Sequence, residues 1–211
     1  MAEIARLSGH SDWIEVEFVE RERTPSELMQ LGIRLHVAGL SLSNTIRELE
    51  KFGVGRSRKA VHDWVPKTDL QPANDAGPDH IALDEPVIRI NGQQFWLYAA
   101  VDSDTNEFLH IRLYTTTTTA LTQQFLQELR EKHDVSDAVF LVDYAKHLAT
   151  ALRQAGLRFQ TMCHGNRSAV ERVFREVKRR TSSVGNSFSH AQPTTAETWL
   201  QAVAVWWNSL H

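Results

Sequence analysis

Cysteine is the scarcest residue of this sequence, with Cys163 alone among 211 residues. One cysteine cannot form an internal disulfide, and it excludes zinc sites built from several cysteines. Long apolar runs are missing too, since no stretch approaches the roughly 18 residues typical of a membrane span. The first 20 residues lack a basic start followed by an apolar run, so no signal peptide is predicted. These absences predict a cytoplasmic protein with no membrane partner.

A large net charge of either sign is also absent. The chain has 23 Lys and Arg against 26 Asp and Glu, a formal net charge of −3, which argues against coating nucleic acid through bulk positive charge. The charge is nevertheless segmental, because residues 21–67 hold nine Lys and Arg against five acids, and residues 161–180 hold six against two. Two basic segments therefore flank an acidic middle, and their meaning depends on the residues that they contain.

The first basic segment predicts three short helices. On the first, Leu28, Leu31, Leu35 and Ala38 recur at helical spacing and are expected to face the core. Thr24 is the predicted N-cap of the first helix, before Pro25, and Gly39 ends that helix. Ser41 or Ser43 caps the second helix, which the glycine turn 53–55 follows. The third helix starts near Ser57 and runs to Trp64, where Pro66 stops it. A glycine turn before a basic last helix favours a helix-turn-helix, and a plain bundle with a basic face is the alternative.

In a helix-turn-helix the last helix enters the major groove of DNA, where cations contact phosphates or base edges. Ala60, Val61 and Trp64 are predicted to face inward. The candidate DNA-binding residues of this segment are Arg56, Arg58, Lys59 and His62.

Residues 67–80 contain two prolines and no apolar periodicity, so they predict a linker. This places a helix-turn-helix domain at 25–66, after an N-terminal extension at 1–24, and a second domain at 81–211. The second domain opens with three predicted antiparallel strands, at 81–89, 94–101 and 107–114, with Asn91-Gly92 as a hairpin turn.

Helices and strands then alternate. The predicted elements are a helix at 121–133 after the threonine run 115–119, a strand at 138–142, a helix at 145–154 that Gly156 ends, a strand at 157–162, and helices at 169–180 and 194–210. Trp199, Val203 and Trp206 share one face of the last helix, which is interpreted as a packing face. This is the element order of an α/β, RNase H-like domain with a mixed five-stranded sheet.

Three carboxylates stand where such a fold brings them together. Asp84 lies in the first strand, Asp143 ends the fourth, and Glu171 lies early in the predicted helix 169–180. Convergent carboxylates suit two Mg²⁺ ions, because hard cations prefer oxygen ligands. Taken alone, the pattern leaves Glu85 as an alternative to Asp84, and Glu176 as an alternative to Glu171.

The stretches ALDEPVIRINGQQFWLYAAVDSDTNEFLHIRL, FLVDYAKHL and HGNRSAVERVFREVKRRT resemble the DDE transposases of insertion sequences, in particular the archaeal branch of the IS-six family. The resemblance covers roughly residues 25–210. It implies a catalytic and metal-binding triad of Asp84, Asp143 and Glu171, the last chosen over Glu176 by its distance from Lys178-Arg179-Arg180. One departure is the 27 residues between Asp143 and Glu171, fewer than is usual in that family.

Cations around Glu171 are predicted to hold the DNA backbone near the metal ions. They are Arg167, Arg172, Arg175, Lys178, Arg179 and Arg180. Asn166 and Arg167 precede the predicted helix, where a phosphate could bind its N-terminus. Asp102 is interpreted as structural, and the pair Cys163-His164 lacks partners at zinc spacing.

The resemblance implies Mg²⁺-dependent cleavage and strand transfer of DNA, with Mn²⁺ able to replace Mg²⁺ and two ions expected per site. The expected partners are double-stranded DNA, as terminal inverted repeats and target, and further copies of the chain in a dimer or larger assembly. The bound protein would be associated with the nucleoid. Two alternatives are a catalytically inactive, transposase-derived DNA-binding protein and an RNase H-like nuclease that does not join strands.

Overall fold

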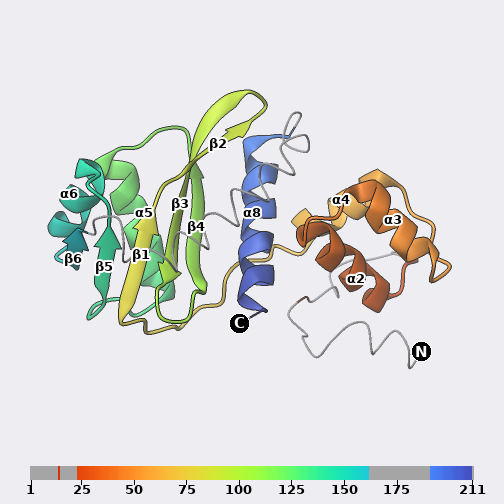
Figure 1. The fold of residues 1–211 in the computed structure, drawn as a ribbon, viewed down its shortest axis with the longest axis horizontal. Helices are drawn as coiled ribbons and strands as arrows, with labels where there is room; N and C mark the ends of the chain where they lie inside the picture. Colours follow the sequence, from red (N-terminus) through yellow and green to blue (C-terminus); the bar gives the residue numbers. More distant parts are fainter. Residues whose placement is uncertain (1–13, 15–22, 162–190, 211) are drawn as a thin grey trace. The chain divides into compact units, whose positions relative to one another are not determined.

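The computed structural model describes residues 14, 23–161 and 191–210, which fall into two compact units (Figure 1). One unit is helical and comprises the chain up to Gln71 together with Thr198–Leu210. The other comprises Pro72–Glu197 and contains the sheet. Within the described ranges, no helix is both long and apolar enough to cross a membrane.

The helical unit contains the three helices that the sequence predicts, α2 (Ser26–Val37), α3 (Leu42–Glu50) and α4 (Arg58–Lys67). The Ser41 hydroxyl accepts a hydrogen bond from the Asn44 N–H at 3.3 Å, and the Ser57 hydroxyl accepts one from Ala60 at 3.1 Å. Each bond satisfies one N–H that the first turn of a helix leaves unbonded. Both predicted N-caps are therefore confirmed.

Three local predictions are wrong. Pro25, not Thr24, is the N-cap of α2, because the Thr24 hydroxyl is buried and accepts a hydrogen bond from Arg56 Nε at 2.7 Å. α4 continues past Pro66 to Lys67, so the proline lies in the last turn instead of stopping the helix at Trp64. The buried face of α2 is also rotated from the predicted one. It consists of Leu28, Met29, Gly32, Ile33, His36 and Val37.

Gly32 lets α2 approach α3 and α4 closely. A Cβ at this position would lie 2.9 Å from Cζ3 of Trp64 and 3.2 Å from Cδ1 of Leu49, and the Trp64 ring is fully buried. We expect Gly32→Ala to destabilise the helical unit by about 1–3 kcal/mol through overpacking, less the roughly 1 kcal/mol that alanine gains as a better helix former. Amide hydrogen exchange of α2 in the full chain measures the change.

Gly55→Ala is the matched control, because a Cβ there meets nothing within 4 Å. Exchange in α2 should be unchanged in this variant. Equal protection of α2 in Gly32→Ala and the wild type would contradict the close approach at Trp64.

The α/β unit has a six-stranded mixed sheet (Figure 1). Its elements are β1 (His80–Asp84), β2 (Val87–Ile90), β3 (Gln93–Asp102), β4 (Phe108–Tyr114), α5 (Thr119–Lys132), β5 (Val139–Val142), α6 (Lys146–Gln154) and β6 (Arg158–Thr161). Along the chain, α5 connects β4 to β5, and α6 connects β5 to β6. Thr118, in the threonine run, caps α5 by accepting the Leu121 N–H at 3.2 Å. Gly156 follows α6 with φ of +69°, which confirms the predicted end of that helix.

The sheet has six strands instead of five because the predicted strand 81–89 is broken at Glu85-Pro86. The two pieces, β1 and β2, both pair with β3 in antiparallel fashion, and proline has no N–H to contribute to a ladder. β4 pairs with the other edge of β3, and β1 pairs in parallel with β5, which pairs in parallel with β6. This is the RNase H-like arrangement, with the first and fourth predicted strands adjacent.

One face of the sheet is covered by α5 and α6. Ile81 and Leu83 of β1 and Phe140 and Val142 of β5 belong to the core cluster that also contains residues of both helices. Because side chains alternate along a strand, Ala82, Asp84 and Leu141 belong to the opposite face. The position of the carboxylates follows from this alternation.

The first half of α8 (Pro193–Asn208) contacts β4. Its Glu197 carboxylate accepts the Leu113 N–H at 3.0 Å and lies 3.7 Å from the Arg112 guanidinium. A strand edge exposes N–H groups that need partners, and Glu197 supplies one. Of the predicted packing face, Trp199 and Val203, farther along α8, are buried, whereas Trp206 is half-buried.

Candidate active site at the carboxyl ends of β1 and β5

Asp84 and Asp143 lie at equivalent positions of two neighbouring parallel strands. The pairing of β1 with β5 matches His80 to Val139, Ile81 to Phe140 and Ala82 to Leu141. The same offset matches Asp84 to Asp143, where each strand ends. Adjacent strands are about 4.8 Å apart. Continued alternation along each strand assigns both residues to the face opposite α5 and α6, so their backbone positions are neighbours at one edge of the sheet.

Local hydrogen bonds orient both carboxylates. Oδ1 of Asp84 accepts the backbone N–H of Glu85 at 3.0 Å, and Oδ1 of Asp143 accepts that of Ala145 at 2.8 Å. Both aspartates are half-buried. In each case the chain turns immediately after the strand, and the turn holds the carboxylate beside its own backbone.

Glu85 lies on the other face of the sheet. Its carboxylate Oε1 is 3.2 Å from Nε2 of His147, in the first turn of α6, and its side chain is 9% exposed. Tyr98 of β3 lies beside Glu85. Burial raises the pKa of the Tyr98 hydroxyl, its hydrogen bond with Thr122 opposes this shift, and the negative charge of Glu85 raises the pKa further. This position favours Asp84 over Glu85 as the partner of Asp143.

The His147 ring lies near Tyr98 as well as Glu85. Its ring centroid is 6.4 Å from that of Tyr98. Burial lowers the pKa of His147, while the charge of Asp143 partly offsets the shift. No motif in the sequence points to His147, and its place four residues after Asp143 is the one local signal for it.

The predicted third acid and its surrounding cations lie outside the described residues. They are Glu171, Glu176, Arg167, Arg172, Arg175, Lys178, Arg179 and Arg180, together with Cys163, His164 and Asn166. Across the described ranges no group of three His, Cys, Asp or Glu side chains gathers to hold a metal ion. Asp84 and Asp143 supply two carboxylates, and their oxygen donors fit Mg²⁺.

Asp102 has a structural position, as predicted. Its Oδ1 accepts the N–H of Asp104 at 2.8 Å and that of Thr105 at 3.3 Å, which closes the β3–β4 turn. Because β3 runs antiparallel to β1, with Ile81 opposite Asp102, this turn lies at the other end of β1 from Asp84.

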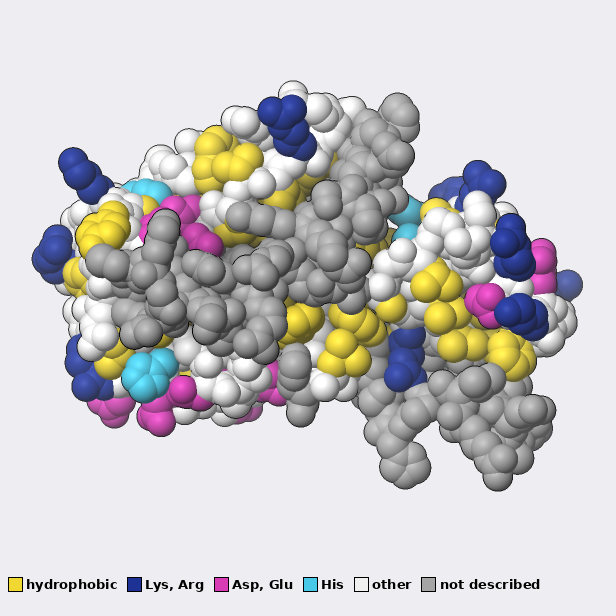
Figure 2. Space-filling model, viewed as in Figure 1, with side chains coloured by type: hydrophobic (Ala, Val, Ile, Leu, Met, Phe, Trp, Pro, Cys, Tyr) yellow, Lys and Arg dark blue, Asp and Glu magenta, His cyan; other side chains and the backbone are white. Residues whose placement is uncertain are grey.

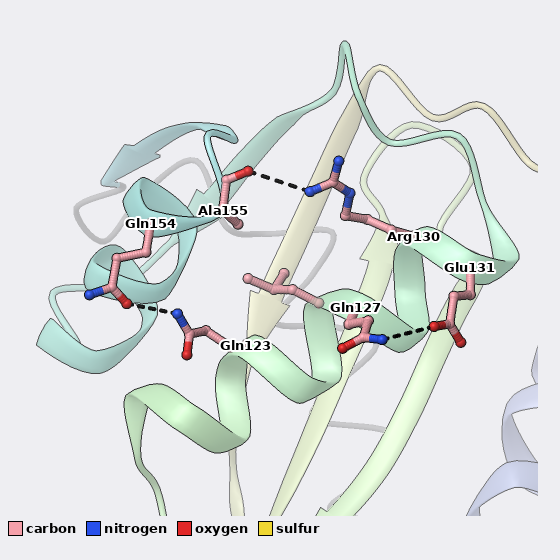
Figure 3. Close-up of a pocket in the computed structure, with 7 residues that line it drawn as sticks. Gln123, Gln127, Arg130, Glu131, Gln154 and Ala155 are labelled. Carbon is pink, nitrogen blue, oxygen red and sulfur yellow. Dashed lines mark hydrogen bonds between the residues drawn. The ribbon is translucent and has the colours of Figure 1, made fainter.

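A groove between α5 and α6 is separate from this edge (Figure 3). Its lining residues are Gln123, Leu126, Gln127, Arg130, Glu131, Gln154 and Ala155. Hydrogen bonds join the two helices there, from the Gln123 amide to Gln154 at 2.8 Å and from Arg130 to the Ala155 carbonyl at 3.4 Å. The groove belongs to the helix-covered face, opposite Asp84 and Asp143.

The exposed side of α4 carries the cations that the sequence assigns to DNA. Arg58, Lys59 and His62 are exposed, whereas Val61 and Trp64 are buried, as predicted. Figure 2 shows Lys and Arg side chains at the surface of the helical unit. Lys59 pairs with Asp63 at 2.6 Å, and Arg56 donates to Thr24 and, at 2.9 Å, to the Gly55 carbonyl. Arg56 therefore also joins the α3–α4 loop to the residue before α2.

Tyr144 is a second residue near the candidate site that no sequence motif singles out. It directly follows Asp143, and 70% of its surface is exposed. An exposed aromatic ring beside a strand-end carboxylate is the kind of surface on which nucleic-acid bases stack.

No protein-family model matches the chain. An uncharacterized protein of Methanocaldococcus jannaschii is 26% identical over 197 residues, which cover 92% of each chain. Among solved structures, the catalytic core domain of BIV integrase matches 60% of this chain and 82% of its own, with 16% identity and a TM-score of 0.43. The HTLV-2 integrase catalytic core domain in complex with magnesium matches 61% and 85%, with 12% identity and a TM-score of 0.43.

A third similar structure is the simian T-cell lymphotropic virus intasome in complex with PP2A regulatory subunit B56 gamma. It matches 83% of this chain and 67% of its own, with 12% identity and a TM-score of 0.47. The RNase H-like assignment of the α/β unit follows from its own strand order and strand directions.

Proposed function

We propose that the protein is a DDE transposase of an insertion sequence, which cleaves the ends of its element and joins them to target DNA. The observation that carries the proposal is the parallel pairing of β1 with β5, two strands whose carboxyl ends carry Asp84 and Asp143. The sequence motifs around these residues and the basic helix α4 support it. Glu171 is the proposed third acid.

The carboxylates of Asp84, Asp143 and Glu171 would bind divalent cations, Mg²⁺ or Mn²⁺, through oxygen atoms. Bound there, such ions would supply activation of an attacking oxygen and charge stabilisation of the leaving oxygen in a phosphodiester displacement. The turn N–H groups of Glu85 and Ala145 hold the two aspartates in place. The attacking group is water in cleavage and the 3′-OH of the element in joining, so no side-chain nucleophile is needed.

The helical unit would bind the terminal inverted repeats as a helix-turn-helix, with α4 in the major groove. The two ends of an element must be held together while their strands are joined. We therefore expect a dimer or larger assembly on DNA.

Arg58→Ala combined with Lys59→Ala should weaken binding to terminal-repeat DNA about tenfold at moderate salt. Each lost phosphate contact should lower the slope of log affinity against log salt by about 0.9. Both side chains are exposed, so folding stability should change by less than about 0.5 kcal/mol. Fluorescence anisotropy at several salt concentrations measures both quantities.

Lys51→Ala is the control for this prediction. Lys51 is an exposed cation of the same unit, paired with Glu48 at 2.6 Å at the end of α3, and it is not on α4. An equal loss of affinity in the control and the double variant would show that α4 is not the reading helix.

The function itself is tested with duplex oligonucleotides that carry the inverted repeats flanking the gene. Metal-dependent cleavage followed by joining to a second duplex supports the transposase. Binding without cleavage identifies a DNA-binding protein without catalysis, and cleavage without joining identifies a nuclease.

A further inference from the structure

We infer that Glu85 and His147 form a positioning pair that fixes the separation of Asp84 and Asp143 for metal binding. The inference rests on the proposed function, since it concerns the same site. It assigns neither residue a contact with DNA or metal. Both would act through the carboxylates on the opposite face of the sheet.

The chain connectivity carries the argument. Glu85 directly follows Asp84, and His147 lies four residues after Asp143, in the first turn of α6. Their side chains approach to 3.2 Å across the two strand ends. The contact therefore joins the segments that hold the two carboxylates, on the side of the sheet where α6 packs.

Burial argues that the pair has more than a stabilising role. The Glu85 side chain is 9% exposed and the His147 side chain 21%, and a buried carboxylate carries a desolvation cost that an apolar residue of similar size would avoid. Sites for metal ions need ligands fixed within about 0.5 Å. Close packing of the two side chains behind the ligands meets this need, and the negative charge of Glu85 adds to the attraction for cations.

Mn²⁺ binding to the full chain with terminal-repeat DNA tests the pair, measured by electron paramagnetic resonance of the unbound ion. Glu85→Gln keeps the shape of the side chain and removes its charge. We expect it to raise the dissociation constant for Mn²⁺ about tenfold, the scale seen when groups behind metal ligands are altered. His147→Gln should do the same, and the double variant should lose little more than either single one.

A matched pair provides the control. His80 Nδ1 lies 3.2 Å from Asp104 Oδ2 at the opposite end of β1. The equivalent amide substitutions there, His80→Gln and Asp104→Asn, should leave Mn²⁺ affinity unchanged. Thermal unfolding of each variant without metal shows whether it is folded. If Glu85→Gln does not fold, His147→Gln carries the test.

Two negative results are distinguishable. If the wild type binds Mn²⁺ and both variants bind it equally well, the positioning pair is overturned while the proposed function stands. If the wild type itself binds no Mn²⁺ with DNA present, the metal site fails, and the pair fails with it.

Discussion

Asp143→Asn should reduce Mg²⁺-dependent cleavage of terminal-repeat DNA by about a thousandfold or more, because the site loses the charge that holds a metal ion at the reacting phosphate. Asparagine has nearly the same shape. Its Oδ1 can still accept the Ala145 N–H, which Asp143 accepts at 2.8 Å. The start of α6 should therefore remain intact, and DNA binding through α4 should be retained. Initial rates of cleavage, compared with binding affinity for the same duplex, measure the effect.

Asp102→Asn is the matched control for this variant. Asp102 also ends a strand and accepts a backbone N–H two residues later at 2.8 Å, but it lies at the other end of β1 from Asp84. Cleavage by this variant should stay within a few fold of the wild type. Full cleavage activity in a folded Asp143→Asn protein would contradict the assignment of the site.

Much of the fold was predictable because the sequence has strong local signals. Ser41, Ser57 and Gly156 mark helix ends by their own chemistry, and all three occupy the predicted positions. The pairing of β1 with β5 depends on contacts distant in sequence. It came from the element order of a known fold, not from the residues of the strands themselves.

Two of the errors depend on a tertiary contact. Thr24 fits an N-cap by sequence, but its hydroxyl accepts a bond from Arg56, 32 residues away. Gly32 is buried on α2 because the Trp64 ring packs against it, which helical spacing alone does not reveal. The break at Pro86 was visible in the sequence, yet both flanking pieces still pair with β3.

At the candidate site, too, some features were predictable from local sequence and others depend on tertiary contacts. Asp84 and Asp143 were predictable as strand-end acids, and the choice between Asp84 and Glu85 required knowing which face each occupies. The contact of Glu85 with His147 provides that information. His147 was missed because its one local signal, a place four residues after Asp143, is weak without knowledge of its contact with Glu85.

The α/β unit should lose about 3 kcal/mol of stability as the pH falls from 6.5 to about 4, through His110. This histidine of β4 is buried beside Phe125, and its Nε2 lies 3.0 Å from the Glu128 carboxylate. Burial lowers the pKa of His110 to about 4; the hydrogen bond to Glu128 opposes the shift, and repulsion from Lys132 adds to it. Arg112 also pairs with Glu128. The negative charge of Glu128 is therefore already balanced, and protonation of His110 would gain little attraction to it.

The direction of the pH dependence follows from these pKa values. The unfolded chain binds a proton at His110 below about pH 6.5, whereas the folded protein stays neutral until about pH 4, so protonation favours unfolding. The stability is complete above pH 6.5 and is lost progressively toward pH 4. Burial raises the pKa of Glu128, but hydrogen bonds from Arg112 and His110 outweigh it and lower the pKa overall, which adds acid sensitivity in the same direction.

Hydrogen exchange of β4 and α5 peptides between pH 7 and 4, corrected for intrinsic rates, measures this loss. His110→Gln should flatten the profile, because glutamine can still donate to Glu128 and does not titrate. Gln124→Ala, which removes a solvent-exposed hydrogen bond of 3.2 Å to the same carboxylate, should keep the wild-type dependence on pH. An equally steep loss of protection in His110→Gln would assign the acid sensitivity to other groups, because the neutral buried imidazole is the feature that this variant removes.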